Sequence, residues 1–430
     1  MKRLAVVALL VVLSGCSMAG APNDAGTEGP DPTQDELGWE DGYWYDDPVD
    51  VDASDGLSEA ELDAVVARSM ARIEKLRGLE FDETVPVDII SRSEYRQNQP
   101  FEVNGTEARW NNQVWEGLLL VGENRNISSV FEQAYGSAVL GYYSPDEDRI
   151  VIVSDSDEPN VDRGTLVHEL VHALQDQRFG IGDSPGTQDA QLARNGVIEG
   201  EANVIQQRYR QRCGGNWSCV ETTPSFGGGG DIDRGVLTVI RYPYTVGPDF
   251  VEAIEERGGW DAVDALYDDY PASTEQVSNP SLFPDDGPTS VTVPDRSSAD
   301  WERFDTDPVA DTVGQASIQV MLGMNDAGST GYTGPASDGW EGDSLVPYRA
   351  DGQYGYVWEL AWETPEDARQ FEEAYVDALY ENGADTTDGA VYVVPDSSPF
   401  GDAFRVTQEG DRVRIVNAPT VDALDGVHAG

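Results

Sequence analysis

The chain has 430 residues and carries 80 acidic side chains against 27 basic ones, for a formal net charge of -53. This charge argues against nucleic acid as a partner, because binding to phosphates needs the opposite sign. At low salt the mutual repulsion of these charges would strain a compact fold. The Debye length shortens to about 3 Å at 1 M salt, which weakens this repulsion, so we expect a halophilic protein. With 39% hydrophobic residues, the chain has enough apolar side chains for a substantial core.

Residues 1–16 have the pattern of an export signal. Two basic residues precede an apolar run that is too short to span a bilayer. The run ends in Leu-Ser-Gly-Cys16, which resembles the lipobox of secreted lipoproteins, where the cysteine becomes the lipidated first residue of the mature chain. This resemblance implies a lipid anchor at Cys16 on the extracellular face of the cell membrane.

Residues 17–55 are rich in Gly, Pro, Asp and Glu and show little apolar periodicity, which predicts a disordered acidic tether. Four aromatic residues interrupt it: Trp39, Tyr43, Trp44 and Tyr45. The sequence leaves open whether they dock on the folded part or on a neighbouring molecule. Beyond the tether we expect a domain over residues 56–284 and a C-terminal region over 285–430 packed on it.

The spacing of apolar residues predicts an α+β fold for both parts. In the first part we expect helices over 57–79 (with Ser58 as the cap), 108–121, 248–257 and 260–268, and strands over 85–90, 140–144 and 149–154. In the second we expect helices over 312–324 and 365–379, a strand over 354–362 and a hairpin of 403–407 with 413–416. The C-terminal α+β unit carries no metal-binding or nucleophilic pattern.

The sequence His168-Glu169-Leu170-Val171-His172 lies in a segment without Gly or Pro. A helix there would place the two imidazoles on one face, where they can hold one zinc ion, Zn²⁺. Glu169 can then take a proton from a metal-bound water. Two of the three histidines of the chain belong to this motif, which favours a metal site over two packed histidines.

A catalytic zinc site needs a third protein ligand. We expect a carboxylate, because no thiol is available and His428 lies at the end of the chain. Glu199 and Glu201 would lie about 200° apart on a helix, so only one can face the metal. We choose Glu199, which follows two apolar residues and precedes Gly200, where another helix could approach closely.

These motifs resemble those of two known groups of proteins. His-Glu-x-x-His followed by Glu199-Gly200 resembles the gluzincin-type zinc metallopeptidases, whose third ligand is the Glu of such a pair. Residues 57–380 also resemble a group of uncharacterised haloarchaeal surface lipoproteins and their bacterial relatives. The motifs shared with that group are Gly141-Tyr142-Tyr143, Tyr-x-x-Gly-x-x-Phe-Val over 244–251 and Pro-x-Ser-Thr-Glu-Gln over 271–276. Relatives often have His where this chain has Asn279.

The resemblance implies a zincin-like helical core with a small β-sheet beside the metal helix. It implies a zinc peptidase with His168, His172 and Glu199 as ligands and Glu169 as the base. Such an enzyme needs a donor for the oxyanion, for which we expect Tyr244, through its place in the family motif, or Arg241. A peptide or protein substrate could add to a sheet edge at residues 150–153, unless these form an inner strand.

Cys213 and Cys219 bracket a turn that a disulfide could close outside the cell, the alternative being two free thiols. The main alternative function is a catalytically inactive surface or cell-envelope binding lipoprotein, which Asn279 favours. A solute-capturing lipoprotein is a weaker alternative, because the chain shows no two-lobed α/β pattern.

Overall fold

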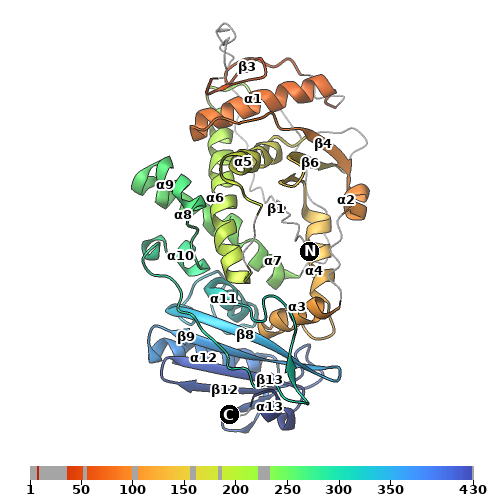
Figure 1. Ribbon diagram of the computed structural model, residues 1–430, viewed down its shortest axis with the longest axis vertical. Helices are drawn as coiled ribbons and strands as arrows, with labels where there is room; N and C mark the ends of the chain where they lie inside the picture. The colour runs from red at the N-terminus through yellow and green to blue at the C-terminus, as the bar shows by residue number, and fades with distance from the viewer. Residues whose placement is uncertain are drawn as a thin grey trace.

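The computed structural model describes residues 7–8, 36–51, 56–98, 105–154, 161–182, 186–220 and 233–428. It is an α+β fold with a small sheet near one end, a large sheet at the other, and the long helix α6 (Gln188–Cys213) between them (Figure 1). Cys16, most of the predicted signal and the glycines at 227–230 lie outside the described residues. None of the described helices has the length and apolar character needed to cross a bilayer.

The first part of the chain contributes a helical layer and the smaller sheet. Its helices are α1 (Glu59–Arg77), α2 (Arg92–Asn98), α3 (Thr106–Gly117), α4 (Ile127–Ala138), α5 (Arg163–Phe179) and α6. The predicted cap of α1 is confirmed: Ser58 accepts from the Glu61 amide, and the Glu61 side chain accepts from the Ser58 amide. α1 packs against both α5 and α6.

The smaller sheet has the strand order β1-β5-β6-β4. Its strands are β1 (Val7–Ala8), β4 (Val87–Ser91), β5 (Gly141–Ser144) and β6 (Arg149–Ser154). β6 pairs with β5 on one side and β4 on the other. Of the two alternatives for residues 150–153, the inner strand is therefore correct and the sheet edge is not. β5, which pairs with the two-residue β1, lies toward the edge instead.

Residues 36–51 differ from the predicted tether, because they pack on α1. They form a hairpin of β2 (Trp39–Glu40) and β3 (Tyr43–Trp44). The Gly38 amide donates to the Glu74 carboxylate at 2.6 Å, and the Tyr45 carbonyl accepts from Arg72 at 2.6 Å. This aromatic stretch thus docks on the folded part of its own chain.

Helices α7 (Arg234–Ile240), α8 (Tyr242–Gly258), α9 (Trp260–Asp264) and α10 (Thr274–Ser278) follow, with short 3₁₀ turns η1 (Ala265–Tyr267) and η2 (Pro280–Leu282). α6 and α8 cross with their backbones in contact. A Cβ at Gly200 would lie 2.5 Å from the Gly247 carbonyl carbon, and one at Gly247 would lie 2.2 Å from the Gly196 oxygen. The predicted close approach at Gly200 is confirmed, with α8 as the partner.

The C-terminal region forms an antiparallel sheet in the order β10-β11-β12-β13-β9-β8-β7. Its elements are β7 (Glu302–Arg303), α11 (Gly314–Met324), β8 (Trp340–Ala350), β9 (Gln353–Trp362), α12 (Pro365–Glu381), β10 (Asp385–Asp388), β11 (Val391–Val393), β12 (Ala403–Glu409), β13 (Arg412–Ala418) and α13 (Val421–Val427). Trp358 belongs to the core that includes Phe371 of α12, whereas Val357 belongs to the core that includes Leu424 of α13. Successive strand residues point to opposite faces, so the two helices cover opposite faces of the sheet.

One hydrophobic core crosses the predicted domain boundary at residue 285. It joins Trp115 of α3 and Val197 of α6 to Val320 of α11 and Trp358 of β9. The two predicted regions therefore share buried surface rather than having separate cores.

The first turn of α6 is bound by the C-terminal region. The N-cap residue Thr187 makes no side-chain cap, and the Gln188 amide donates instead to the Asp311 carboxylate at 2.8 Å. The next amide, of Asp189, donates to the Thr312 carbonyl at 2.9 Å. Backbone donors that a helix leaves unpaired at its start are thus satisfied by a distant segment.

Candidate metal centre

α5 presents the two histidines of the motif on one buried face. Asp162 starts the helix by accepting a hydrogen bond from the Thr165 amide at 2.9 Å. His168 and His172 lie one turn apart, as their spacing predicts, with ring centroids 4.6 Å apart. Both side chains are buried, at 0% and 1% exposed, so their nitrogens face other protein groups rather than bulk water.

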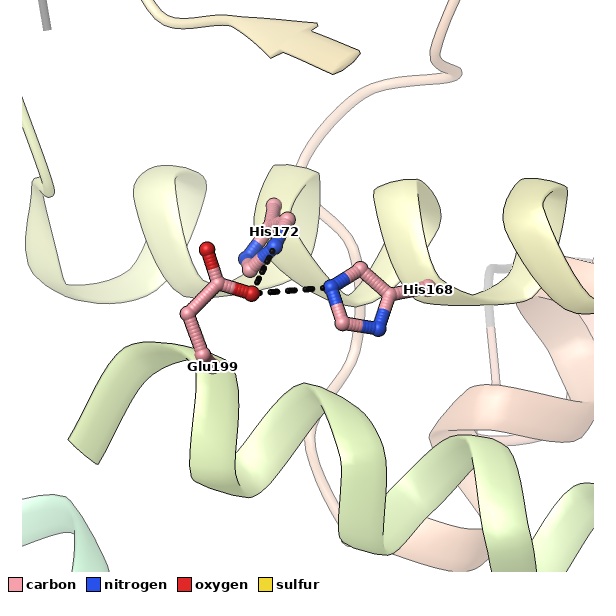
Figure 2. Close-up of side chains that lie close together, drawn as sticks. All are labelled: His168, His172 and Glu199. Carbon is pink, nitrogen blue, oxygen red and sulfur yellow. Dashed lines mark hydrogen bonds and ion pairs between the residues drawn. The ribbon is translucent and has the colours of Figure 1, made fainter. Parts of the chain in front are cut away.

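Glu199 of α6 points between the two rings (Figure 2). Its Oε2 lies 3.0 Å from Nε2 of His168 and 3.3 Å from Nε2 of His172. One ligand atom from each of the three residues lies within 4.8 Å of the others, and all three residues are buried. The structure therefore brings together the two imidazoles and the carboxylate that the sequence singled out.

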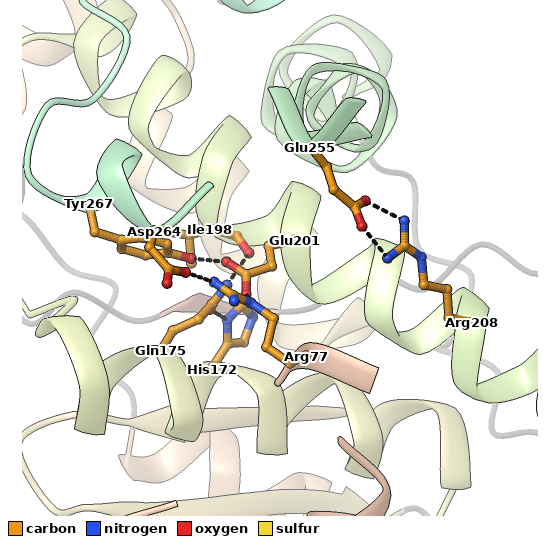
Figure 3. Close-up of polar contacts among 9 residues, drawn as sticks. All are labelled: Arg77, His172, Gln175, Ile198, Glu201, Arg208, Glu255, Asp264 and Tyr267. Carbon is orange, nitrogen blue, oxygen red and sulfur yellow. Dashed lines mark hydrogen bonds and ion pairs between the residues drawn. The ribbon is translucent and has the colours of Figure 1, made fainter. Parts of the chain in front are cut away.

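Glu201, the alternative to Glu199, faces a different partner (Figure 3). Its carboxylate accepts from the guanidinium of Arg77 on α1 and from the hydroxyl of Tyr267. Arg77 also binds Asp264, and its guanidinium lies 4.3 Å from the Trp260 ring centroid. Because the two glutamates point in different directions from α6, Glu199 contacts the histidines and Glu201 forms a buried ion pair.

Gln175 is a contact residue that the sequence reasoning missed. Nδ1 of His172 donates to Oε1 of Gln175 at 2.8 Å, and Nε2 of Gln175 donates to the Ile198 carbonyl at 2.9 Å (Figure 3). Gln175 therefore orients one imidazole and ties α5 to α6 beside Glu199. Its position three residues after His172, on the same helix face, is the signal that could have identified it.

Glu169 lies beside the centre and is held by β5. The Tyr143 amide donates to Oε2 of Glu169 at 2.9 Å, while Oε1 has no hydrogen-bond partner among the described residues. Burial raises the pKa of Glu169 to about 8. One carboxylate oxygen is thus fixed by the backbone, and the other remains available for a proton.

Tyr244 of α8 contacts the centre through Glu199. Its hydroxyl donates to Oε1 of Glu199 at 2.8 Å, and its ring stacks beside His168 with centroids 6.4 Å apart. The hydroxyl thus holds the Glu199 carboxylate in place, and its expected role as oxyanion donor stays a prediction. Arg241, the alternative donor, lies at the junction of α7 and α8.

The ionisation states of the two histidines and Glu199 depend on one another. Burial opposes ionisation of Glu199, but the neighbouring imidazoles outweigh it and lower its pKa to about 2. Burial alone would lower the pKa of His172, but Glu199 raises it to about 9. Burial lowers the pKa of His168. Near neutral pH the centre therefore contains an ionised Glu199, a protonated His172 and a neutral His168.

The other motifs of the resemblance also contact α5 or α6. A Cβ at Gly141 would lie 2.8 Å from Cγ2 of Thr165 on α5. The hydroxyl of Thr274 donates to Asp189 on α6 at 2.6 Å, which makes this motif a structural connection. Asn279, where relatives often have His, accepts from the hydroxyl of Ser281 at 2.6 Å and caps η2.

A cavity of 280 Å³ reaches the centre from the side of Glu199 and Tyr244. Tyr135 of α4 also lines it and was not predicted as a site residue. Nothing in the sequence links α4 to α6, because their proximity depends on the tertiary fold. The cavity provides space next to the carboxylate for part of a ligand.

The predicted disulfide between Cys213 and Cys219 is formed. It closes the turn after α6, where Trp217 packs against Tyr209 and under the guanidinium of Arg72. The disulfide therefore fixes the end of the helix that carries Glu199.

A family described as "Domain of unknown function (DUF8575)" matches residues 302–428. The matched segment starts at β7 and contains the whole seven-stranded sheet with α11, α12 and α13. No curated protein and no solved structure matches the chain. The residues of the candidate centre lie outside the matched segment.

Proposed function

We propose that the protein is a zinc-dependent metallopeptidase. The observation that carries this proposal is the convergence of His168, His172 and Glu199 at one buried point, with Glu169 beside it. Ion pairs between His and Glu occur without metals, but this set has the His-Glu-x-x-His spacing and a carboxylate from a second helix. Two imidazoles and one carboxylate form a known catalytic zinc ligand set.

The distances support a fit to zinc. Ligand atoms about 2.1 Å from a tetrahedral ion lie roughly 3.4 Å from one another. The Glu199 oxygen lies 3.0 and 3.3 Å from the two imidazole nitrogens, so small side-chain shifts would admit an ion. Apart from its 3.3 Å contact with the Glu199 carboxylate, Nε2 of His172 has no partner among the described residues, so an ion between the two would meet no competing hydrogen bond there. Gln175 supplies the outer hydrogen bond that zinc-binding histidines usually make.

When bound, zinc would lower the pKa of a water at its open position toward about 7 and polarise a substrate carbonyl. Glu169 would accept a proton from the attacking water at Oε1 and return it to the leaving amine nitrogen. Burial raises the pKa of Glu169 above that of a solvated carboxylate, which makes the ionised group a stronger proton acceptor. Tyr244 would hold the Glu199 carboxylate in its ligand orientation.

The position of β5 favours an extended peptide as substrate. Tyr143 donates its amide to Glu169, so the strand runs directly beside the proposed base. On its outer side β5 pairs with Val7–Ala8, a short extended segment of the same chain. A substrate could bind there through main-chain hydrogen bonds after removal of the predicted signal.

The proposal includes attachment to the extracellular face of the membrane by a lipid on Cys16 and activity in concentrated salt. The lipobox pattern and the net charge of -53 support these two parts. Replacing the anchor residue, Cys16→Ser, is expected to release the protein from the membrane fraction into the medium, and continued membrane attachment would contradict the anchor.

The experiment that tests the function combines metal content with turnover in molar salt. The native protein is expected to contain one zinc per chain and to digest unfolded casein, with activity lost on adding a chelator. Glu169→Gln keeps all three ligands and is expected to retain zinc while losing turnover. Peptidase activity equal to native in Glu169→Gln would refute the role of Glu169.

The second candidate is a surface-binding lipoprotein that keeps the fold but does not cleave. The feature that favours it is Asn279, whose side chain caps η2 where relatives often have His. A native protein that binds zinc and leaves every tested unfolded protein intact in molar salt would favour this alternative.

A further inference from the structure

We propose that a second group of carboxylates, outside the candidate metal centre, is a binding site for one calcium ion that links the two regions of the fold. The group consists of Glu116, Glu123 and Asp402, and one oxygen from each lies within 4.8 Å of the others. This inference is independent of the peptidase function, because none of the three residues contacts the histidines or Glu199.

The three carboxylates come from both regions of the chain. Glu116 lies in the last turn of α3, and Glu123 follows in the turn before α4. Asp402 directly precedes β12 of the large sheet, and α3 lies against β8 and β9 of that sheet (Figure 1). The backbones also meet here, because the Glu123 amide donates to the Pro399 carbonyl at 3.1 Å. An ion bound by all three carboxylates would therefore connect the end of α3 to the loop that leads into β12.

Two of these carboxylates are removed from solvent without a cationic partner. Glu116 and Asp402 are 4% and 5% exposed, whereas Glu123 is exposed and leaves the group open on one side. In the part of the chain that the structure describes, no Arg, Lys or His forms an ion pair with any of the three. Arg125, which is close in sequence, pairs with Asp233 instead. Buried charges are normally paired or coordinate a metal, so this group lacks a positive charge.

The contacts within the group require something positive between the carboxyl groups. Those of Glu123 and Asp402 lie within hydrogen-bonding distance of each other, where two ionised carboxylates would repel. Burial raises the pKa of Glu116 well above its ordinary value, and burial together with Glu123 raises the pKa of Asp402 to about 8. The group must therefore share protons or bind a cation, and a divalent cation would offset the repulsion among all three members.

Two buried amides point into the group, and each has an unused oxygen. Nε2 of Gln113 donates to Glu116 at 2.6 Å, and Nδ2 of Asn417 donates to Asp402 at 2.9 Å. Oε1 of Gln113 and Oδ1 of Asn417 are buried and have no hydrogen-bond partner among the described residues. Leaving a buried acceptor unpaired is unfavourable. Turning each amide by half a turn would present its oxygen to a cation at the place where its nitrogen now contacts a carboxylate. These idle oxygens favour a bound cation over shared protons.

The ligand atoms fit calcium. Ca²⁺ binds about six to eight oxygens at about 2.3–2.6 Å, so ligands on opposite sides of the ion lie about 4.6–5.2 Å apart. Three carboxylate oxygens within 4.8 Å of one another can thus all reach one ion. The two amide oxygens add further ligands, and water can complete the shell on the open side beside Glu123. Mg²⁺ demands a near-ideal octahedron and keeps several waters, and Zn²⁺ prefers nitrogen and sulfur, which the group does not offer.

The test measures calcium binding by the native protein after chelation with EGTA. Molar KCl suppresses diffuse binding of cations to the acidic surface. Calorimetry is expected to show one calcium per chain with a Kd of about 10⁻⁴–10⁻³ M, the range of extracellular calcium modules. About 10 mM calcium should then raise the ratio of folded to unfolded protein in urea by about 10–100-fold over the chelated protein. The same concentration of magnesium is expected to leave this ratio near that of the chelated protein.

Two variants locate the ion, and a third is the matched control. Glu123→Gln removes one proposed ligand on the exposed side of the group, and Glu132→Gln removes the same charge from an exposed position of α4. Glu123→Gln is expected to weaken calcium binding about 10-fold or more, whereas Glu132→Gln leaves the Kd unchanged. Asp402→Asn is expected to abolish binding. Without calcium it should be at least as stable as the native protein, because it removes a repelling charge.

The outcomes distinguish a specific calcium site from its alternatives. Equal calcium affinity in Glu123→Gln and Glu132→Gln overturns the proposal, because the ion would then bind elsewhere on the acidic surface. A native protein that binds no calcium, or that calcium and magnesium stabilise equally, also overturns it and leaves shared protons as the reason for the contact between Glu123 and Asp402. The comparison of the two glutamate variants remains decisive if Asp402→Asn does not fold.

Discussion

The crossing of α6 and α8 can be tested by adding one methyl group, in Gly200→Ala. The new Cβ would lie 2.5 Å from the carbonyl carbon and oxygen of Gly247, whereas ordinary contacts begin near 3.4 Å. The helices must then separate by about 0.9 Å. Because Tyr244 lies one turn before Gly247, a shift of that size would stretch its 2.8 Å hydrogen bond to Glu199 beyond an effective length.

The expected change in the free energy of unfolding combines two opposing effects. Overpacking typically costs about 1–3 kcal/mol, and replacing Gly by Ala within a helix returns up to about 1 kcal/mol. We expect Gly200→Ala to lower the free energy of unfolding by about 1–2 kcal/mol and to weaken zinc binding by about 10–100-fold, as for other outer contacts of a metal ligand.

The matched control is Gly136→Ala in α4, where the new Cβ would lie 3.8 Å from the Arg96 side chain, an ordinary contact. This variant is expected to be as stable as the native protein or up to about 1 kcal/mol more stable, with unchanged zinc affinity. Guanidinium denaturation in constant salt and competition with a chelator measure both quantities. If Gly200→Ala matches the control in stability and affinity, the close crossing does not position Tyr244.

Three further predictions concern the centre itself. Glu199→Gln should lose the zinc found by elemental analysis, and equal zinc content in Glu199→Gln and Glu201→Gln would contradict the ligand assignment. Glu201→Gln should retain zinc but destabilise the fold by about 1.5–3 kcal/mol in denaturation, because Arg77 then keeps only Asp264 as an anionic partner. The pKa of His172 is raised to about 9 and zinc needs the neutral ring, so calorimetry should show an affinity that rises about tenfold per pH unit from pH 7 to 9, with proton release, and levels off above. A zinc affinity that stays constant from pH 7 to 9 would show that His172 does not lose a proton in that range. Tyr244→Phe should weaken zinc binding by about 10–100-fold in chelator competition, and an unchanged affinity would show that its hydroxyl does not orient Glu199.

The parts of the site that the sequence could predict are those set by helix geometry. The spacing of His168 and His172 determines their common face whatever surrounds α5. The choice between Glu199 and Glu201 followed from the angle between them and the adjacent glycine, and the structure places Glu199 at the imidazoles and Glu201 at Arg77. Local periodicity is sufficient for such predictions, because residues on one helix have fixed angular positions about its axis.

The parts that the sequence could not predict depend on contacts between distant segments. β6 becomes an inner strand only because residues 87–91 pair with it, and no local pattern reveals that partner. Tyr135 likewise meets Glu199 only through the packing of α4. β8 was missed because its residues are buried in a continuous run rather than in alternation, and the run contains Gly342 and Pro347.

Composition misled the interpretation of residues 36–51. Their acidity is typical of a solvated linker, yet a few aromatic rings and two backbone contacts to α1 hold them on the fold. In a chain with a net charge of -53, acidic residues are common on folded surfaces too, so charge alone does not distinguish a linker from a packed segment.

The start of α6 has a consequence for how this protein can be divided. Its first two amides are satisfied by Asp311 and Thr312, which belong to the segment matched by the domain family. A truncation that ends before this segment would leave those donors in water and let the first turns of the helix fray, with Glu199 only three turns further along. The C-terminal region thus supports a centre to which it contributes none of the three proposed ligands, and the two parts have to be expressed and engineered as one piece.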